Sequence, residues 1–218
     1  MALGWLKGVG LVLDLGCAEG MFAHLASGDG WQVVGMDVDA ASVTNARRQA
    51  PRAEFSLGSG EALPFQDRAF DAVVLLDVLE HVPYEERTLR EVARVLKPGG
   101  RLVISVPHRG TFGFIDAQNS VMFAAGRKVI KGRNGPPRHH KHYSMADLQG
   151  LLGPSFKVCR QRYGGYLLLP VLGYLLMFTD ALRLARVSEA LRHVEQVDFD
   201  MDRGERSWHL MAEFAKQG

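Results

Sequence analysis

The chain has 218 residues, a length that favours one α/β domain with additions. Its apolar fraction of 47% and charged fraction of 23% are ordinary for a globular protein, and its net charge of +2 is too small to indicate a nucleic-acid partner. Two cysteines cannot supply a disulfide framework, which fits a reducing, cytoplasmic compartment. The first residues lack the pattern of a signal peptide, so we expect none.

The first predicted elements are a strand at 11–15 and a helix near 20–27, joined by a glycine turn. The apolar residues of the strand predict burial on both faces of a sheet. Gly16 and Gly20 mark a tight turn in which the backbone comes close to a ligand. A strand, a glycine turn and a helix in this order are typical of a nucleotide-cofactor cradle.

The spacing of the glycines in this turn indicates which kinds of ligand it can bind. Gly16 and Gly20, with Ala18 between them, do not form the G-x-G-x-x-G pattern of a dinucleotide site, and there is no phosphate-binding P-loop motif. Asp14 and Glu19 flank the glycines, and fixed negative charge repels a phosphate. The turn therefore suits a ligand that carries positive charge.

A second strand, predicted at 32–37, also ends in an acid. Asp37 lies 21 residues after Gly16, near the spacing at which a strand-end carboxylate accepts hydrogen bonds from a ribose. The alternative role is the N-cap of a helix predicted at 40–50, but Asp39 is better placed for it. Asp37 is then available for the ribose.

The remaining elements continue the alternation of strand and helix. Such alternation predicts a parallel sheet with right-handed crossovers. Pro98-Gly99-Gly100 predicts the end of a helix and a turn before the next strand. We expect strands at 53–57, 70–76, 101–106 and 155–163, helices at 84–96 and 144–152, and a last, antiparallel strand within 206–216.

Five segments between residues 11 and 106 form an ordered pattern: Asp14-x-Gly16-x-x-x-Gly20, Asp37, and the segments 58–65, 70–82 and 94–102. This pattern resembles the class I S-adenosylmethionine-dependent methyltransferases, particularly the broad group that includes the quinone-biosynthesis methyltransferases. The match covers roughly half the chain, and its order makes it far more specific than one glycine motif.

The resemblance implies an α/β, Rossmann-like, doubly wound sheet of seven mostly parallel strands with an antiparallel last strand. It implies one methyltransferase domain over 1–218, with two long insertions at 109–143 and 164–205 that form a cap over the cofactor. The cofactor is then S-adenosylmethionine, and the expected activity is methylation of a small-molecule or lipid-like acceptor on oxygen or carbon.

The resemblance also carries over residues that bind the cofactor. Ala18 stands where most members have glycine, and Ser59 stands where many have an acid that accepts a hydrogen bond from the adenine amine; Glu61 is a substitute for that acid. For Asp14 and Asp77, the alternative to cofactor binding is a structural role, in which the carboxylate stabilises its own loop by hydrogen bonds. The expected cofactor-binding residues are Asp14, Gly16, Ala18, Gly20, Asp37, Val38, Ser59, Gly60, Glu61, Asp77 and Val78.

Two histidines are candidates for the proton acceptor in methyl transfer. His81 follows the strand at 70–76, and His108 follows the strand at 101–106, so both belong to the carboxyl edge of the predicted sheet. The alternative for each is a packing or loop residue. We expect no metal, because His139, His140 and His142 lie on a loop without a matching Cys or carboxylate set.

The second half of the chain contains an uncharged run at 163–179 and a basic stretch at 127–142. Pro170 and Gly173 interrupt the apolar run, which is also short for a membrane span. A buried cap helix is the first interpretation. The second is an apolar wall for a lipid-like substrate, or a surface that contacts a membrane peripherally.

Two other functions compete with an acceptor-specific enzyme. The departures at Ala18 and Ser59 are compatible with a protein that binds S-adenosylmethionine without catalysis. A nucleic-acid methyltransferase is the other alternative, but the Asn/Asp-Pro-Pro-aromatic motif is missing and the basic residues gather in one loop. We therefore expect a small-molecule or lipid-like substrate and no nucleic-acid partner. The sequence does not predict an oligomeric state.

Overall fold

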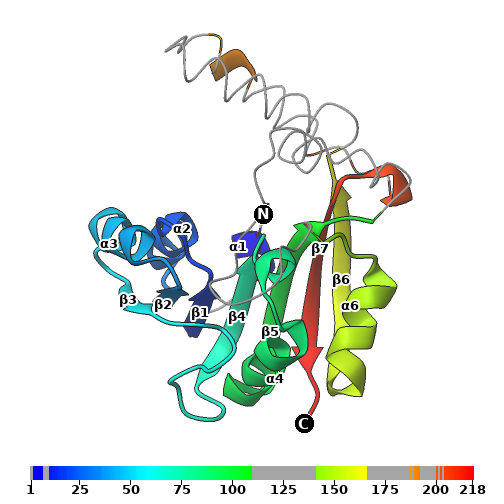
Figure 1. The fold of residues 1–218 in the computed structure, drawn as a ribbon, viewed down its shortest axis with the longest axis horizontal. Coiled ribbons are helices and arrows are strands. Elements are labelled where there is room, and N and C mark those ends of the chain that lie inside the picture. The colour runs from blue at the N-terminus through cyan, green and yellow to red at the C-terminus, as the bar shows by residue number, and fades with distance from the viewer. Residues whose placement is uncertain are drawn as a thin grey trace. The chain divides into compact units, whose positions relative to one another are not determined.

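The structure is a computed structural model that describes residues 2–6, 10–109, 141–165, 187, 189–191, 200, 202 and 204–218. Its centre is a seven-stranded sheet with the strand order β3-β2-β1-β4-β5-β7-β6 (Figure 1). The strands are β1 (Leu11–Leu15), β2 (Gln32–Asp37), β3 (Glu54–Leu57), β4 (Phe70–Leu76), β5 (Leu96–Pro107), β6 (Phe156–Gly164) and β7 (His209–Lys216). The helices are α1 (Ala2–Trp5), α2 (Met21–Gly28), α3 (Ala40–Gln49), α4 (Glu85–Val95) and α6 (Met145–Leu152), with short 3₁₀ turns η1 (Leu79–His81), η2 (Gly153–Ser155) and η3 (Gly204–Arg206).

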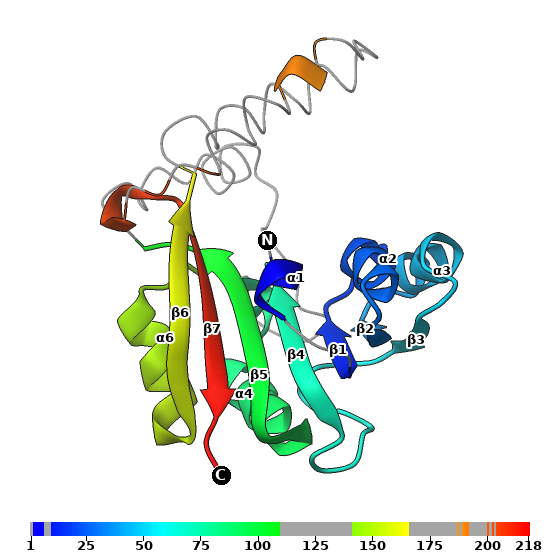
Figure 2. The same ribbon diagram turned by 180° about the vertical axis from the view of Figure 1, so that it is seen from behind.

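The sheet is mostly parallel. β1 pairs in parallel with β2 and β4, β2 with β3, and β4 with β5. Only β7 runs against its neighbours β5 and β6 (Figure 2). The predicted fold class, a doubly wound sheet with an antiparallel last strand, is confirmed. Because the chain leaves β1 for β2 on one side and reaches β4 on the other, the strand order reverses at β1, where open α/β sheets bind ligands.

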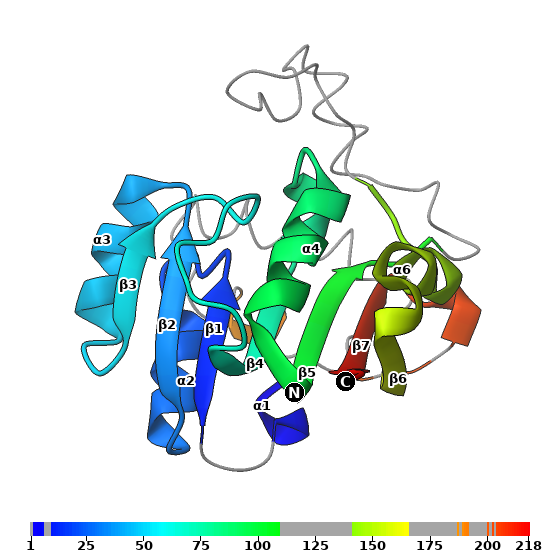
Figure 3. The same ribbon diagram turned by 90° about the horizontal axis from the view of Figure 1, so that it is seen from below.

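Burial of the central strands explains why apolar runs form them. The side chains of Val12, Leu13 and four consecutive residues of β4 are at most slightly exposed, as expected for strands covered on both faces. The buried residues of α4, which are Thr88, Leu89, Val92 and Val95, recur at helical spacing and form one face. α4 lies over β4 and β5, and α6 lies over β6 (Figures 1 and 3). Helix α1 lies on the opposite face of the sheet (Figure 2).

One predicted boundary is wrong. The turn predicted at Pro98–Gly100 is part of β5, which begins at Leu96 directly after α4 ends at Val95. Leu96 pairs with Phe70 and Arg101 with Ala72, so the residues between Leu96 and Arg101 form a bulge rather than a break in the strand. The short helix α1 was not expected from the sequence.

The chain divides into two compact units. The first consists of residues 1–105, 147–160 and 212–218, and the second of 106–146 and 161–211. Most of the predicted cap, at 109–143 and 164–205, lies outside the described residues, as do most of the basic stretch and the uncharged run. Among the described residues, no helix has the length and apolar character that a membrane span requires.

Candidate functional site

The turn after β1 is built from residues with left-handed backbone. Gly16, Ala18 and Gly20 have φ angles of +77°, +43° and +82°. The amide groups of Gly16 and Cys17 both donate to the carbonyl oxygen of Met36, at 2.7 and 3.1 Å. A Cβ on Gly16 would lie 2.3 Å from Cγ2 of Val78, so only glycine fits there. The turn is thereby fixed against β2 and the loop after β4.

Asp37 joins this turn to the start of α3. Its Oδ2 accepts a hydrogen bond from the amide of Ala18, and its Oδ1 accepts one from the amide of Asp39, both at 2.9 Å. Asp39 in turn accepts from the amide of Ser42 at 2.8 Å, so Asp39 is the N-cap of α3, as predicted. Each carboxylate oxygen of Asp37 can accept a second hydrogen bond, and the side chain is only half-buried.

Asp14 is a buried acid whose oxygen Oδ2 has no hydrogen-bond partner among the described residues. The side chain is 2% exposed at the end of β1. Burial, and secondarily the charge of Asp37, raise the pKa of Asp14 to about 7. A buried acceptor without a partner is costly, so this oxygen is suited to a cationic or hydrogen-bond-donating group.

Beside Asp37, the ends of β2 and β3 present apolar side chains to solvent. Val38 is 72% exposed, and Leu57, which pairs with Asp37 in the sheet, is 59% exposed. The amide of Gly58 donates to the carbonyl of Asp37 at 2.9 Å. The hydroxyl of Ser59 accepts from the amide of Glu61 at 3.3 Å, so Ser59, Gly60 and Glu61 follow as a turn. Exposed apolar groups beside hydrogen-bonding groups suit a flat heterocycle.

The loop after β4 carries Asp77, Val78 and His81. Asp77 has φ +55°, its amide donates to the carbonyl of Ser105 at 2.9 Å, and its Oδ1 accepts from the Ser105 hydroxyl at 3.3 Å. Glu80 is buried, and this burial raises its pKa to about 8. Oε1 of Glu80 lies 3.8 Å from Nε2 of His81.

His81 is placed to exchange protons with solvent or substrate. Its side chain is 44% exposed, and partial burial lowers its pKa although Asp77 acts in the opposite direction. A histidine with a lowered pKa is neutral at pH 7 and can accept a proton.

His108 belongs to the second unit. Its ring is fully buried, its Nδ1 donates to the carbonyl of Ser207 at 2.9 Å, and its edge packs against the ring of Tyr163. These contacts are those of a structural histidine. A catalytic role for His108 stays a prediction.

Cys17 lies in the glycine turn but is not activated. Burial, with the charges of Asp14 and Asp37, raises the pKa of its thiol to about 12. The thiol therefore stays protonated and packs as a small apolar residue.

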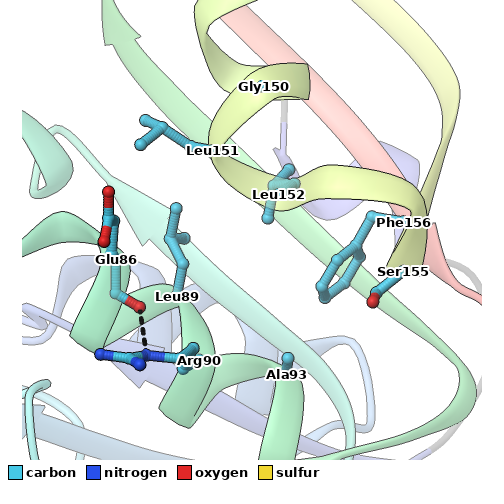
Figure 4. A pocket seen from close by; sticks show the side chains of 9 residues that line it. All are labelled: Glu86, Leu89, Arg90, Ala93, Gly150, Leu151, Leu152, Ser155 and Phe156. Atoms are coloured by element: carbon cyan, nitrogen blue, oxygen red, sulfur yellow. Dashed lines mark hydrogen bonds between the residues drawn. The ribbon is translucent and has the colours of Figure 1, made fainter.

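A cavity of about 390 Å³ opens in the first unit, in a different place from these residues (Figure 4). Its floor is apolar, with side chains of Leu89, Leu152 and Phe156, and Glu86 and Arg90 line it beside one another on α4. None of the predicted site residues lines it.

The structure brings most of the predicted cofactor residues to one edge of the sheet. The glycine turn contacts both Asp37 and Val78, the charge of Asp37 acts on Asp14, and Asp77 precedes Val78. Sequence reasoning missed Leu57, whose only signal is an apolar residue at the predicted end of a strand. A turn at the switch point, with an acid near the end of β1 and another at the end of β2, is typical of nucleoside sites in Rossmann-like proteins.

Comparison with known proteins shows which family of Rossmann-like proteins the chain is similar to. Residues 13–104 match a family model described as "Methyltransferase domain". The chain is 34% identical over 143 residues to a probable S-adenosylmethionine-dependent methyltransferase of Mycolicibacterium smegmatis, a match that covers 65% of this chain and 49% of the relative. It is 35% identical over 102 residues to a demethylmenaquinone methyltransferase of Renibacterium salmoninarum, covering 47% and 43%. Residues 13–104 are therefore similar to the methyltransferase domain of S-adenosylmethionine-dependent methyltransferases.

The fold is shared more widely than the sequence. A crystal structure of an S-adenosylmethionine-dependent methyltransferase from Methanosarcina mazei matches with a TM-score of 0.66 over 98% of this chain and 95% of that one, at 19% identity. The chain spans about half, or less, of the length of the curated relatives it matches.

Proposed function

We propose that this protein transfers the methyl group of S-adenosylmethionine to oxygen or carbon of a small-molecule or lipid-like acceptor in the cytoplasm. One observation carries the proposal: Asp37 accepts a hydrogen bond from the amide of Ala18 in the glycine turn, and Oδ2 of Asp14, two residues before that turn, is buried with no hydrogen-bond partner among the described residues. This arrangement leaves acceptors for a ribose and for a cationic group within one turn. Residues 14–20 themselves contain no basic side chain for a phosphate.

The residues present fit this cofactor. Asp37 retains lone pairs for the ribose hydroxyls, and the exposed side chains of Val38 and Leu57 offer contact area to the adenine. Oδ2 of Asp14 is an acceptor for the ammonium group of the methionine part, whose positive charge would offset the cost of ionising a buried acid. Bound there, S-adenosylmethionine supplies an electrophilic methyl group on a positively charged sulfur.

The chain's own contribution to the chemistry is positioning and proton removal. Much of the rate of a methyl transfer comes from holding the acceptor in line with the reacting atoms. We assign His81 the role of base for an acceptor hydroxyl, because its imidazole is half-exposed and neutral at pH 7. The charge of Asp77, which acts to raise the pKa of His81, stabilises the imidazolium that results.

We infer the chemical class of the methyl acceptor from the names of the related proteins. The matched protein of Renibacterium salmoninarum is named a demethylmenaquinone methyltransferase, so its named substrate is a quinone. An apolar ring compound agrees with the second interpretation of the uncharged run at 163–179 and with peripheral contact to a membrane. The small net charge gives no support for a nucleic-acid substrate.

Isothermal titration with S-adenosylmethionine tests the cofactor assignment. We expect binding by the wild-type chain, and at least tenfold weaker binding by Asp37→Ala, since it loses charge-assisted hydrogen bonds. Asp39→Ala is the matched control, because it removes a neighbouring carboxylate that caps α3 instead. Equal affinity of wild type and Asp37→Ala would overturn the assignment.

Transfer of a radioactive methyl group into a cell extract tests the activity. Label in the organic-soluble fraction supports a lipid-like acceptor, and label in the aqueous small-molecule fraction supports a polar one. Binding without any transfer would instead favour a cofactor-binding protein without catalysis. Transfer to nucleic acid, with a steep dependence on salt, would overturn the proposed acceptor class.

A further inference from the structure

Arg94, near the end of α4, forms hydrogen bonds to the segment 58–67, which follows β3. Its Nη1 donates to the carbonyl of Phe65 at 2.7 Å and to Oδ1 of Asp67 at 2.8 Å. Its Nη2 donates to the carbonyl of Leu63 at 2.9 Å. One guanidinium thus holds three residues that lie about thirty positions earlier in the chain.

Glu91, one turn earlier on α4, completes this clamp. Its two oxygens accept from Nε and Nη2 of Arg94 at 2.9 and 2.8 Å. Its Oε2 also accepts from the amide of Leu63 at 2.8 Å. Both backbone groups of Leu63 are therefore held by α4, and a planar fork of donors is needed to reach the carbonyls and the carboxylate together.

The other end of the same segment is fixed at the candidate cofactor site. The amide of Gly58 bonds to the carbonyl of Asp37, and a Cβ on Gly60 would lie 3.2 Å from Leu15, the residue before the glycine turn. Ser59 and Glu61 stand between the two fixed ends. The position of the predicted adenine-binding groups therefore depends on α4 as well as on β2.

We propose that Arg94 is a positioning residue that holds the wall of the adenine pocket, an inference that rests on the proposed function. The guanidinium does not contact the cofactor in this proposal. It sets the distance between the 59–61 turn and Asp37, and so governs affinity for the adenosine part of any ligand.

Two ligands test this proposal: S-adenosylhomocysteine, and 5′-methylthioadenosine, which has the same adenosine part but lacks the amino acid. We expect Arg94→Ala to weaken both by the same factor, tenfold or more, and to raise the KM for S-adenosylmethionine with kcat changed less than threefold. Asp14→Asn should weaken only S-adenosylhomocysteine. Arg90→Ala is the matched control, since Arg90 lies one turn earlier on α4 and donates to the carbonyl of Glu86 on the same helix.

Glu91→Gln keeps the shape of the clamp and removes its charge, so it provides a milder variant if Arg94→Ala folds poorly. It should weaken both ligands by a smaller, equal factor. Affinities of Arg94→Ala or Glu91→Gln within twofold of wild type, or a loss restricted to S-adenosylhomocysteine, would overturn the proposal. A wild-type chain that binds neither ligand would instead overturn the proposed function.

Discussion

Replacing Asp14 by asparagine separates the effect of this acid on folding from its effect on the cofactor. The pKa of Asp14 is raised from 3.8 to about 7, first by burial and then by Asp37. The folded chain thus holds this proton more tightly than the unfolded chain. Asp14 therefore costs stability progressively as the pH rises from about 4 through about 7. A shift of about three pKa units at 1.36 kcal/mol each sets a ceiling of about 4 kcal/mol above pH 7.

Urea denaturation of the cofactor-free protein at pH 5 and pH 8 measures this cost. Asparagine cannot ionise, so Asp14→Asn should be more stable than wild type at pH 8, and the advantage should shrink by about 2.6 kcal/mol at pH 5. The same variant should bind S-adenosylmethionine at least tenfold more weakly, because the ammonium loses its carboxylate. A gain in stability together with a loss of affinity is the signature of a residue kept for function.

Asp71 supplies a control, because its pKa is shifted in the opposite direction from that of Asp14. Burial acts to raise its pKa, but hydrogen bonds from Lys97 and from the amide of Leu11 outweigh it and lower the pKa. Asp71→Asn should therefore lose stability at pH 8, where wild-type Asp71 is ionised. If Asp14→Asn were less stable than wild type at pH 8, or had the same pH dependence, the reasoning about Asp14 would be refuted.

Three further predictions concern the backbone of the site, its base and its flanking helix. Ala18 adopts a left-handed backbone that costs about 1 kcal/mol, and Ala18→Gly removes this cost, although the freedom of glycine in the unfolded chain offsets part of the gain; the melting temperature should therefore rise by roughly 1–3 °C. Gly16→Ala places a Cβ against Val78 and should lower the melting temperature by more than this. A lower melting temperature for Ala18→Gly would contradict the proposed strain. The pKa of His81 is lowered, so kcat for an oxygen acceptor should fall on acidification with an inflection below pH 6.5 that His81→Ala abolishes; an unchanged profile in that variant would exclude His81 as the base. Asp39→Ala should cost about 1 kcal/mol in urea denaturation by removing the cap of α3, with cofactor affinity retained; a large loss of affinity would assign the cofactor role to Asp39.

The sequence predicted the strands well where a buried apolar run is bounded by residues that end a strand. The strands at 11–15, 32–37 and 70–76 agree with β1, β2 and β4 to the residue, because each apolar run is bounded by an acid, a glycine or a turn. The start of β5 was missed for a non-local reason. Lys97-Pro98-Gly99-Gly100 is typical of a turn, and only the pairing of both Leu96 and Arg101 with β4 makes it a bulge.

The same limit applies to the candidate site. Asp14, Gly16 and Asp37 follow from spacing along the chain, and their contacts confirm that they lie together. The clamp formed by Glu91 and Arg94 could not be predicted in this way. Its partners are 27 to 31 residues away, and no local pattern marks a charged helix residue that bonds to backbone carbonyls of another loop.

Backbone strain and a buried acid gather at one edge of the sheet, around the loops after β1 and β4. In the described part of the chain, three non-glycine residues have positive φ angles, and two of them, Ala18 and Asp77, lie in the loops after β1 and β4. The same edge holds Asp14, a buried acid with one oxygen that has no hydrogen-bond partner among the residues that the structure describes. Each feature costs stability, and folding alone gives no reason to collect them in one place. Such a concentration is expected where a ligand supplies the missing hydrogen bonds and selection acts on binding instead.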